Sequence, residues 1–156
     1  MKISPKLLST SLAFIVAPLF VSADDISLNP SNWTANSDAK VTAQGDELRV
    51  KSLASSVWLA PAERIKYQQD DALEVQYALR GGNLIVQANW FDANGNYLET
   101  ATLGKTTSDK DQALFRVAPS KQFVKAAEFY EVKLWIEADM PSLTLESLSI
   151  LRDVDS

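Results

Sequence analysis

The sequence predicts an all-β domain in which two antiparallel sheets pack face to face as a β-sandwich or jelly roll. Apolar and polar residues alternate with a period of two along most of the chain after residue 24. Glycine, asparagine, aspartate and proline separate these alternating runs, as they do in turns. No segment shows the 3.6-residue spacing of an amphipathic helix. These observations favour about eight to ten short strands joined by turns.

The first 23 residues have the pattern of a secretory signal peptide. Lys2 and Lys6 precede an apolar stretch at 12–21, and the small residues Ser22 and Ala23 follow it. The stretch is shorter than the roughly 20 residues of a membrane-spanning helix. An N-terminal helix packed on the domain is the alternative. We expect export to the periplasm or medium, with residues 24–156 forming a single domain.

The composition excludes several kinds of site and partner. The chain has no cysteine and no histidine, which excludes Ser-His-Asp and Cys-His catalysis and zinc sites with those ligands. The net charge is −5, and it becomes −7 without the first 23 residues, because that segment holds two lysines and no acidic residue. An acidic chain repels polyanions, so we expect neither a nucleic-acid partner nor an anionic membrane surface. No segment after the N-terminal one is long enough for membrane insertion.

The first strands are short. Residues 40–44 and 47–52 read as a hairpin around a Gly45-Asp46 turn, and residues 57–59 read as a strand that ends before Pro61. Residues 61–67 fit either a helical turn or a strand.

The clearest alternation occurs at 72–80, where the apolar residues Leu73, Val75, Tyr77 and Leu79 occupy every second position. Gly81-Gly82 has the residue types of a two-residue hairpin turn, so we expect residues 83–91 to return beside this strand. Pairing across that turn would place Leu79 opposite Leu84, Tyr77 opposite Val86, Val75 opposite Ala88, and Leu73 opposite Trp90. On the other face it would place Gln76 opposite Gln87 and Glu74 opposite Asn89.

The second half of the chain has a similar pattern. Asn94-Gly95 predicts a hairpin between 83–91 and 97–103, with Thr100 and Thr102 continuing the polar face of Gln87 and Asn89. A polar loop is expected at 104–111 and a strand at 112–118. Residues 126–138 split into an apolar face and a face that is polar yet aromatic. The last strand, 143–150, changes phase near Ser147 in the manner of a β-bulge.

From residue 32 onward, this order of features resembles the galactose-binding-like jelly rolls, a class that includes many carbohydrate-binding modules. The likeness is carried by the strand at 72–80 with its glycine pair, and by the segments QANWFDANGNYLET, AAEFYEVKLWIEA and SLTLESLSILRD. Modules of this class bind glycans on a concave sheet or at the loops between the sheets, and many hold a structural calcium ion. The resemblance therefore implies glycan binding without catalysis, and it leaves a structural calcium site open.

A sugar site needs an exposed flat aromatic ring together with amide and carboxylate groups. Trp135 is the strongest candidate, because its alternation phase is opposite to that of the apolar set on its strand. Trp90 falls in the core phase, and Trp58 fits either a stacking platform or a covered strand edge. The candidate ligand-binding residues are Trp135, Lys133, Glu131, Phe129, Gln76, Gln87, Asn89 and Glu74.

Metal binding and catalysis have weaker support. Asp92, Asn94 and Asn96 alternate oxygen ligands as a calcium loop does, but the Asn-Gly hairpin explains the same residues, and no metal ligands are assigned. A glycosidase needs two acids across a cleft, and no loop of this chain is long enough to wall one, so no catalytic residue is expected.

Two functions therefore stay open. The first is a non-catalytic glycan-binding module, and the second is a periplasmic protein-interaction or assembly protein that uses the same face. A protein interface should show a contiguous apolar patch of several hundred Å². A sugar site should be narrower, with one or two aromatic rings among polar groups. The sequence leaves the oligomeric state open.

Overall fold

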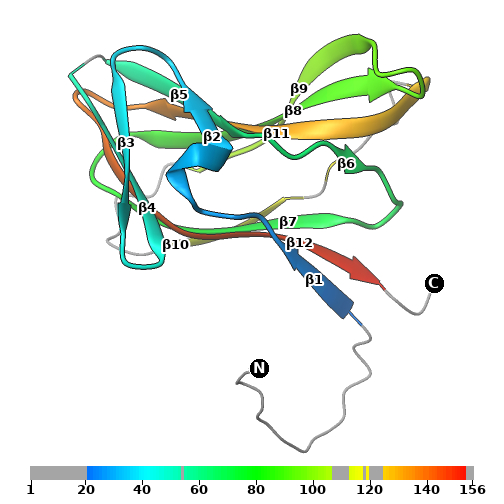
Figure 1. The fold of residues 1–156 in the computed structure, drawn as a ribbon, viewed down its shortest axis with the longest axis horizontal. Helices are drawn as coiled ribbons and strands as arrows, with labels where there is room; N and C mark the ends of the chain where they lie inside the picture. Colours follow the sequence, from blue (N-terminus) through cyan, green and yellow to red (C-terminus); the bar gives the residue numbers. More distant parts are fainter. Residues whose placement is uncertain (1–20, 54, 107–112, 118, 120–124, 154–156) are drawn as a thin grey trace, which may run out of the picture.

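Two antiparallel sheets face each other in the computed structural model, which describes residues 21–53, 55–106, 113–117, 119 and 125–153 (Figure 1). Within these residues the only helix is the 3-10 turn η1 (Pro30–Asn32), and no helix is long and apolar enough to cross a membrane. Sheet A contains β1 (Val21–Asp25), β3 (Ala39–Gln44), β4 (Glu47–Ser52), β7 (Ala72–Leu79), β10 (Ala113–Val117) and β12 (Ser142–Asp153). Sheet B contains β2 (Trp33–Ala35), β5 (Ser56–Pro61), β6 (Ile65–Lys66), β8 (Asn83–Asp92), β9 (Tyr97–Thr106) and β11 (Ala127–Glu137).

The order of the strands differs from their order in the chain. Sheet A runs β10-β7-β12-β4-β3, with β1 paired to the far part of β12. Sheet B runs β2-β5-β11-β8-β9, with β6 paired to β11. Every pair is antiparallel, which confirms the predicted all-β sandwich of two antiparallel sheets.

The core lies between the sheets and consists of the apolar residues that occupy every second position of each strand. Trp90, Tyr77 and Tyr130 are its largest fully buried members. Trp33 is also buried, and its indole N–H donates to the backbone carbonyl of Ser27 at 2.8 Å. The burial predicted from the alternation in β7, β8 and β11 is therefore confirmed.

The predicted hairpin at Gly81-Gly82 is wrong. Both glycines have the positive φ of a tight turn, but β7 pairs with β10 and β12, whereas β8 pairs with β9 and β11. The glycine pair thus carries the chain from sheet A to sheet B. The pairings of Gln76 with Gln87 and of Glu74 with Asn89 do not form, and the apolar pairings from Leu79–Leu84 to Leu73–Trp90 fail with them. Alternation specifies that both strands bury one face, and that condition is met equally by two strands on opposite sheets.

The other local predictions hold better. The hairpins β3–β4 and β8–β9 form, and the register of β12 against β7 shifts between Leu145 and Ser147, where the bulge was expected. Within 61–67, Pro61 ends β5, Ile65–Lys66 form the two-residue strand β6, and no helical turn occurs. β9 extends to Thr106, into the predicted loop. Residues 107–112 lie outside the described residues.

The expected signal peptide stays a prediction. Residues 1–20 lie outside the described residues, and Val21, Ser22 and Ala23 pair with β12 as the first part of β1. Cleavage after Ala23 would leave Asp24 and Asp25 as the remaining residues of that strand.

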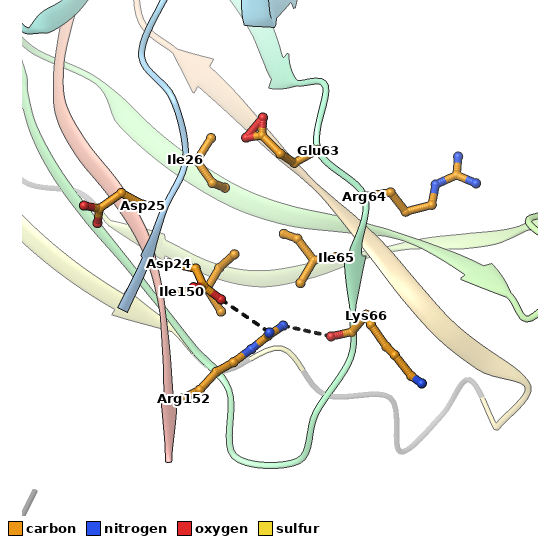
Figure 2. A pocket seen from close by; sticks show the side chains of 9 residues that line it. All are labelled: Asp24, Asp25, Ile26, Glu63, Arg64, Ile65, Lys66, Ile150 and Arg152. Carbon is orange, nitrogen blue, oxygen red and sulfur yellow. Dashed lines mark hydrogen bonds and ion pairs between the residues drawn. The ribbon is translucent and has the colours of Figure 1, made fainter. Parts of the chain in front are cut away.

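A small cavity of about 250 Å³ opens where β1 and β12 of sheet A approach β6 of sheet B (Figure 2). Several of its polar side chains already have partners. Glu63 accepts hydrogen bonds from the Asn32 amide at 2.6 and 3.2 Å, and Arg152 lies between Asp24 and the Lys66 carbonyl. This cavity is therefore part of the scaffold that joins the two sheets.

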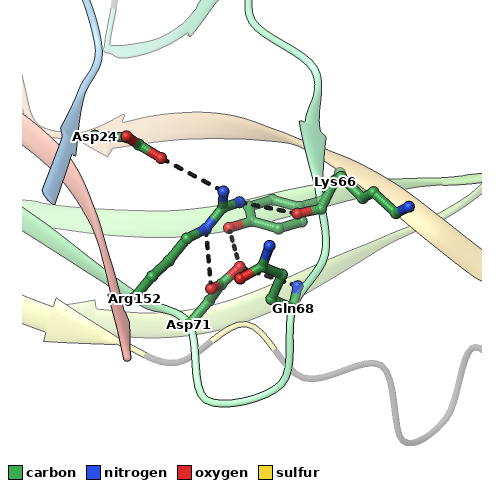
Figure 3. A network of polar contacts seen from close by, with 6 residues as sticks. Asp24, Lys66, Gln68, Asp71 and Arg152 are labelled. Carbon is green, nitrogen blue, oxygen red and sulfur yellow. Dashed lines mark hydrogen bonds and ion pairs between the residues drawn. The ribbon is translucent and has the colours of Figure 1, made fainter. Parts of the chain in front are cut away.

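Arg152 is the centre of a polar network at this end (Figure 3). Its guanidinium donates to Asp71 Oδ1 at 3.2 Å, to Asp24 Oδ2 at 3.4 Å and to the Lys66 carbonyl at 2.9 Å. Buried Asp71 also accepts from the Tyr130 hydroxyl at 3.3 Å. Burial raises the pKa of Tyr130, and the negative charge of Asp71 raises it further. The Tyr130 hydroxyl therefore stays protonated and can donate to Asp71. The network thereby ties β1 and β12 of sheet A to β6 and β11 of sheet B.

We expect Arg152→Ala to lower the free energy of unfolding by about 2 kcal/mol, because it leaves the buried Asp71 carboxylate without a cation. The loss stays below that of a fully buried pair, since the Arg152 side chain is 18% exposed. Urea denaturation measures it, with Lys105→Ala as the control. That lysine pairs with Glu137 at the surface, so its loss should cost less than about 0.5 kcal/mol. Equal losses for the two variants would contradict the role given to Arg152.

The glycine pair provides a second test of the fold. A side chain at Gly82 would collide with the Glu137 carbonyl and with Ala138, whereas a side chain at Gly81 would meet no atom within 4 Å. We expect Gly81→Ala to cost about 1 kcal/mol, from its positive φ alone, and Gly82→Ala to cost roughly 3 kcal/mol or more. Thermal unfolding of the two variants compares them, and similar losses would be inconsistent with this crossing of the chain between sheets.

Candidate functional site

The candidate site is the outer face of sheet B, where the outward side chains of β5, β11, β8 and β9 form rows across neighbouring strands. The tryptophan row contains Trp58, Trp135, Ile85 and Lys105. The amide row contains Lys133, Gln87 and Thr102. The carboxylate row contains Glu131, Asn89 and Thr100, and the phenyl row contains Phe129, Phe91 and Tyr97.

Trp58 and Trp135 are direct cross-strand partners on this face. Both are half-buried, while their strand neighbours, such as Leu59 and Leu134, are fully buried in the core. Lys133 Nζ lies 5.5 Å from the ring centroid of Trp58 and 5.4 Å from that of Trp135, within the range of cation–π attraction. The outer face thus carries two adjacent indole rings with an ammonium group beside them.

Amide and hydroxyl groups continue the face next to the tryptophans. Gln87 Nε2 donates to Thr102 Oγ1 at 3.3 Å, and Thr100 Oγ1 donates to Asn89 Oδ1 at 2.6 Å. These contacts confirm that Thr100 and Thr102 extend the polar face of Gln87 and Asn89. A shallow depression of about 530 Å³ runs over this region, and its lining includes Trp135, Lys133 and Gln87. Lys105 and Glu137 form an ion pair at its rim, with Nζ 3.3 Å from Oε1.

Arg64 covers the far end of the face. Its guanidinium carbon lies 3.6 Å from the Phe91 ring centroid, and its Nη2 lies 2.9 Å from Glu131 Oε2. Nη1 also donates to the Gly95 carbonyl at 3.4 Å. The arginine therefore balances the charge of Glu131 and covers the Phe91 ring of the phenyl row. Tyr97, in the same row, remains 58% exposed.

The structure brings together six of the eight predicted ligand-binding residues: Trp135, Lys133, Glu131, Phe129, Gln87 and Asn89. Gln76 and Glu74 lie on the outer face of sheet A instead, where Gln76 Oε1 accepts from Ser147 Oγ at 3.2 Å. Their predicted place depended on the hairpin that does not form. Ile85, Lys105 and Arg64 also lie on this face. No local sequence pattern identifies them, since their positions depend on pairings between distant segments.

The turn at Asp92 does not fit a calcium ion. Its Oδ1 accepts the backbone N–H groups of Asn94 and Asn96, each at 2.9 Å, and its Oδ2 accepts the Asn96 side-chain amide at 3.3 Å. These hydrogen bonds, led by the one from the Asn96 backbone, lower the pKa of Asp92. Both carboxylate oxygens are engaged in holding the hairpin. Across the described part of the chain, no three acidic residues are grouped to hold a metal.

Comparison with known proteins shows similarity in fold. No protein-family model matches the chain, and no curated protein matches its sequence. A family 29 carbohydrate-binding module complexed with mannohexaose has a TM-score of 0.59 at 8% identity, over 84% of this chain and 92% of that module. A second structure, of a family 29 module complexed with cellulohexaose, has a TM-score of 0.58 at 8% identity, over 85% of this chain and 92% of that one.

A Glycosylation Associate Protein complex from Streptococcus agalactiae also matches, with a TM-score of 0.59 at 13% identity. That match covers 85% of this chain and 26% of the other. At these identities the similarity establishes the architecture alone. The chain is thus an all-β sandwich of the type found in carbohydrate-binding modules.

Proposed function

We propose that the protein is a non-catalytic, exported module that binds a glycan on the outer face of sheet B. The observation that carries the proposal is the side-by-side pair of Trp58 and Trp135 next to the amide row. Sugar rings present apolar C–H faces, which stack on flat aromatic rings, and hydroxyls, which need fixed donors and acceptors. This face offers both kinds of group within one depression.

The amide row has hydrogen-bonding capacity left for a ligand. Gln87 uses one side-chain N–H for Thr102, and an amide has a second N–H and a carbonyl oxygen. Lys133 adds donors directly beside the two rings. Because Gln87 and Lys133 lie on the central strands β8 and β11, the sheet holds them in place before any ligand arrives.

The distribution of polar groups favours a sugar over a protein partner at this face. Lys133 and Gln87 follow the tryptophan row directly, so the apolar surface does not continue along the sheet. An interface for another protein would need a larger contiguous apolar patch. The complexes of family 29 modules with mannohexaose and cellulohexaose add support for a glycan ligand.

The positions of the carboxylates favour binding over hydrolysis. Glu131 and Glu137 lie six positions apart on β11, which is about 20 Å along a strand, whereas the two acids of a glycosidase lie about 5–9 Å apart. Each of them is also paired with a cation, Glu131 with Arg64 and Glu137 with Lys105.

A glycan array probed with the full chain tests the proposal. We expect selective retention, and we expect the same retention with added calcium and with chelator, because binding would rely on stacking and on amide groups. Trp135→Ala should weaken the affinity about tenfold, corresponding to the loss of roughly 1.4 kcal/mol. Its melting temperature should stay close to that of the original protein, since the side chain lies outside the core.

Two glutamines provide a matched control. Gln87→Ala should weaken glycan binding, while Gln76→Ala, which alters the opposite face of the sandwich, should leave it unchanged. No retention on any glycan under either condition would reject the proposal. Equal effects of the two glutamine variants would place the glycan elsewhere on the protein.

A further inference from the structure

Two large apolar side chains protrude at the end of the sandwich where β4 leads to β5 and β11 leads to β12. Leu53 is 87% exposed and Met140 is 61% exposed, and both lie in segments that cross from one sheet to the other. Single exposed apolar residues are common on protein surfaces, whereas neighbouring ones mark an interaction site more often. We refer to Leu53 and Met140 as the apolar tips.

The apolar tips are held beside each other. The backbone N–H of Ser52, next to Leu53, donates to the carbonyl of Pro141, next to Met140, at 3.2 Å. Met140 has φ +45°, a left-handed conformation that is unfavourable for a side chain of this size. Both tips line one depression of about 530 Å³, together with Lys40 and Lys51.

Cations gather directly behind the tips on the outer face of sheet A. Lys40 and Lys51 are direct cross-strand partners on β3 and β4, an arrangement of like charges that destabilises a sheet. Arg49 follows in the next row and lines a second depression together with Arg80.

In the described part of the chain, these four basic residues lack close counter-ions. Among the described residues, none of them has a carboxylate within ion-pair distance. Arg49 Nε is buried and has no hydrogen-bond partner among the residues that the structure describes. Asp38 is the one carboxylate that lines the depression at the tips, as far as the described residues show. The cations are therefore available to an anionic ligand.

We propose that this end of the protein docks on an anionic lipid surface. Leu53 and Met140 would enter the boundary between head groups and acyl chains, and Lys40, Lys51, Arg49 and Arg80 would pair with lipid phosphates. A soluble polyanion would use the cations and leave the apolar tips in water. A bilayer surface presents phosphates on the outside and apolar chains directly beneath them. The apolar tips could reach the chains while the neighbouring cations pair with the phosphates. The glycan face lies on the other sheet and stays accessible.

The test uses a fluorescent label placed at one tip. The chain has no cysteine, so Leu53→Cys accepts a single environment-sensitive dye. With phosphatidylcholine vesicles that contain phosphatidylglycerol, we expect a blue shift of the dye emission that declines as salt is added. Vesicles of phosphatidylcholine alone should give no shift. The same dye at Asp46→Cys, in the turn at the opposite end of β4, should not respond to either vesicle. Both labelled proteins carry the same apolar N-terminal segment, so that segment cannot explain a difference between them.

Charge reversal then tests the cations. Lys40→Glu combined with Lys51→Glu should abolish the blue shift of the dye at position 53. Lys66→Glu combined with Lys125→Glu makes the same change in net charge at exposed sites away from the tips and should keep the shift. Melting curves confirm that both variants are folded. An absent shift, an equal shift with neutral vesicles, or a shift that survives reversal of Lys40 and Lys51 would overturn the proposal. Binding of dextran sulfate by these lysines without a vesicle response would overturn it in favour of a soluble polyanion.

Discussion

Cross-strand pairing along β11 is the constraint on which both the core and the candidate site depend. Tyr130, Val132, Leu134 and Ile136 are fully buried, and the residues between them form the outer face. A register shift of one residue would bury Lys133 and expose the core, so the packing of the sandwich holds the strand in one alignment. That alignment places Trp135 beside Trp58 and Lys133 beside Gln87. The geometry of the site is therefore stabilised by residues that a ligand never contacts.

The two ends of the sandwich are closed by different interactions. At one end, Arg152 and buried Asp71 join β1, β6 and β12 through charged hydrogen bonds. At the other end, the chain crosses between sheets at Gly82, at Leu53 and at Met140, and the backbones approach too closely at Gly82 for a side chain. The face between the ends is built from strands alone. A ligand of this face would meet a surface that needs little rearrangement, which lowers the entropic cost of binding.

Local turn chemistry and alternation were sufficient to predict much of this fold. The Asn94-Gly95 hairpin was predictable because its turn residues are adjacent in the chain, and the burial of Trp90 was predictable from its phase. The pairing of β7 was not predictable from the sequence. Its alternation is the same whether β8 lies beside it in one sheet or opposite it in the facing sheet. This single ambiguity explains why alternation and turn residues predict the wrong sheet for Gln76 and Glu74. The cross-strand pairing of Trp58 with Trp135 joins strands far apart in sequence, so no local pattern identifies it.

Net charge is also a poor guide to local sites, because it sums the charges of the chain and does not say where they lie. An overall charge of −5 predicts repulsion of anions, because at distances comparable with the size of the molecule the positive and negative charges average to their net value. At contact distance the arrangement of charges is decisive instead. β3 and β4 place Lys40 opposite Lys51, and the sheet pairing brings Arg49 and Arg80 to one depression beside two exposed apolar side chains. Like charges held opposite each other reduce the stability of the sheet, and an anion bound between them would relieve that repulsion. An acidic protein can therefore carry an anion-binding end. The long-range repulsion between the protein and an anionic surface would slow their association, most of all at low salt, where screening is weakest.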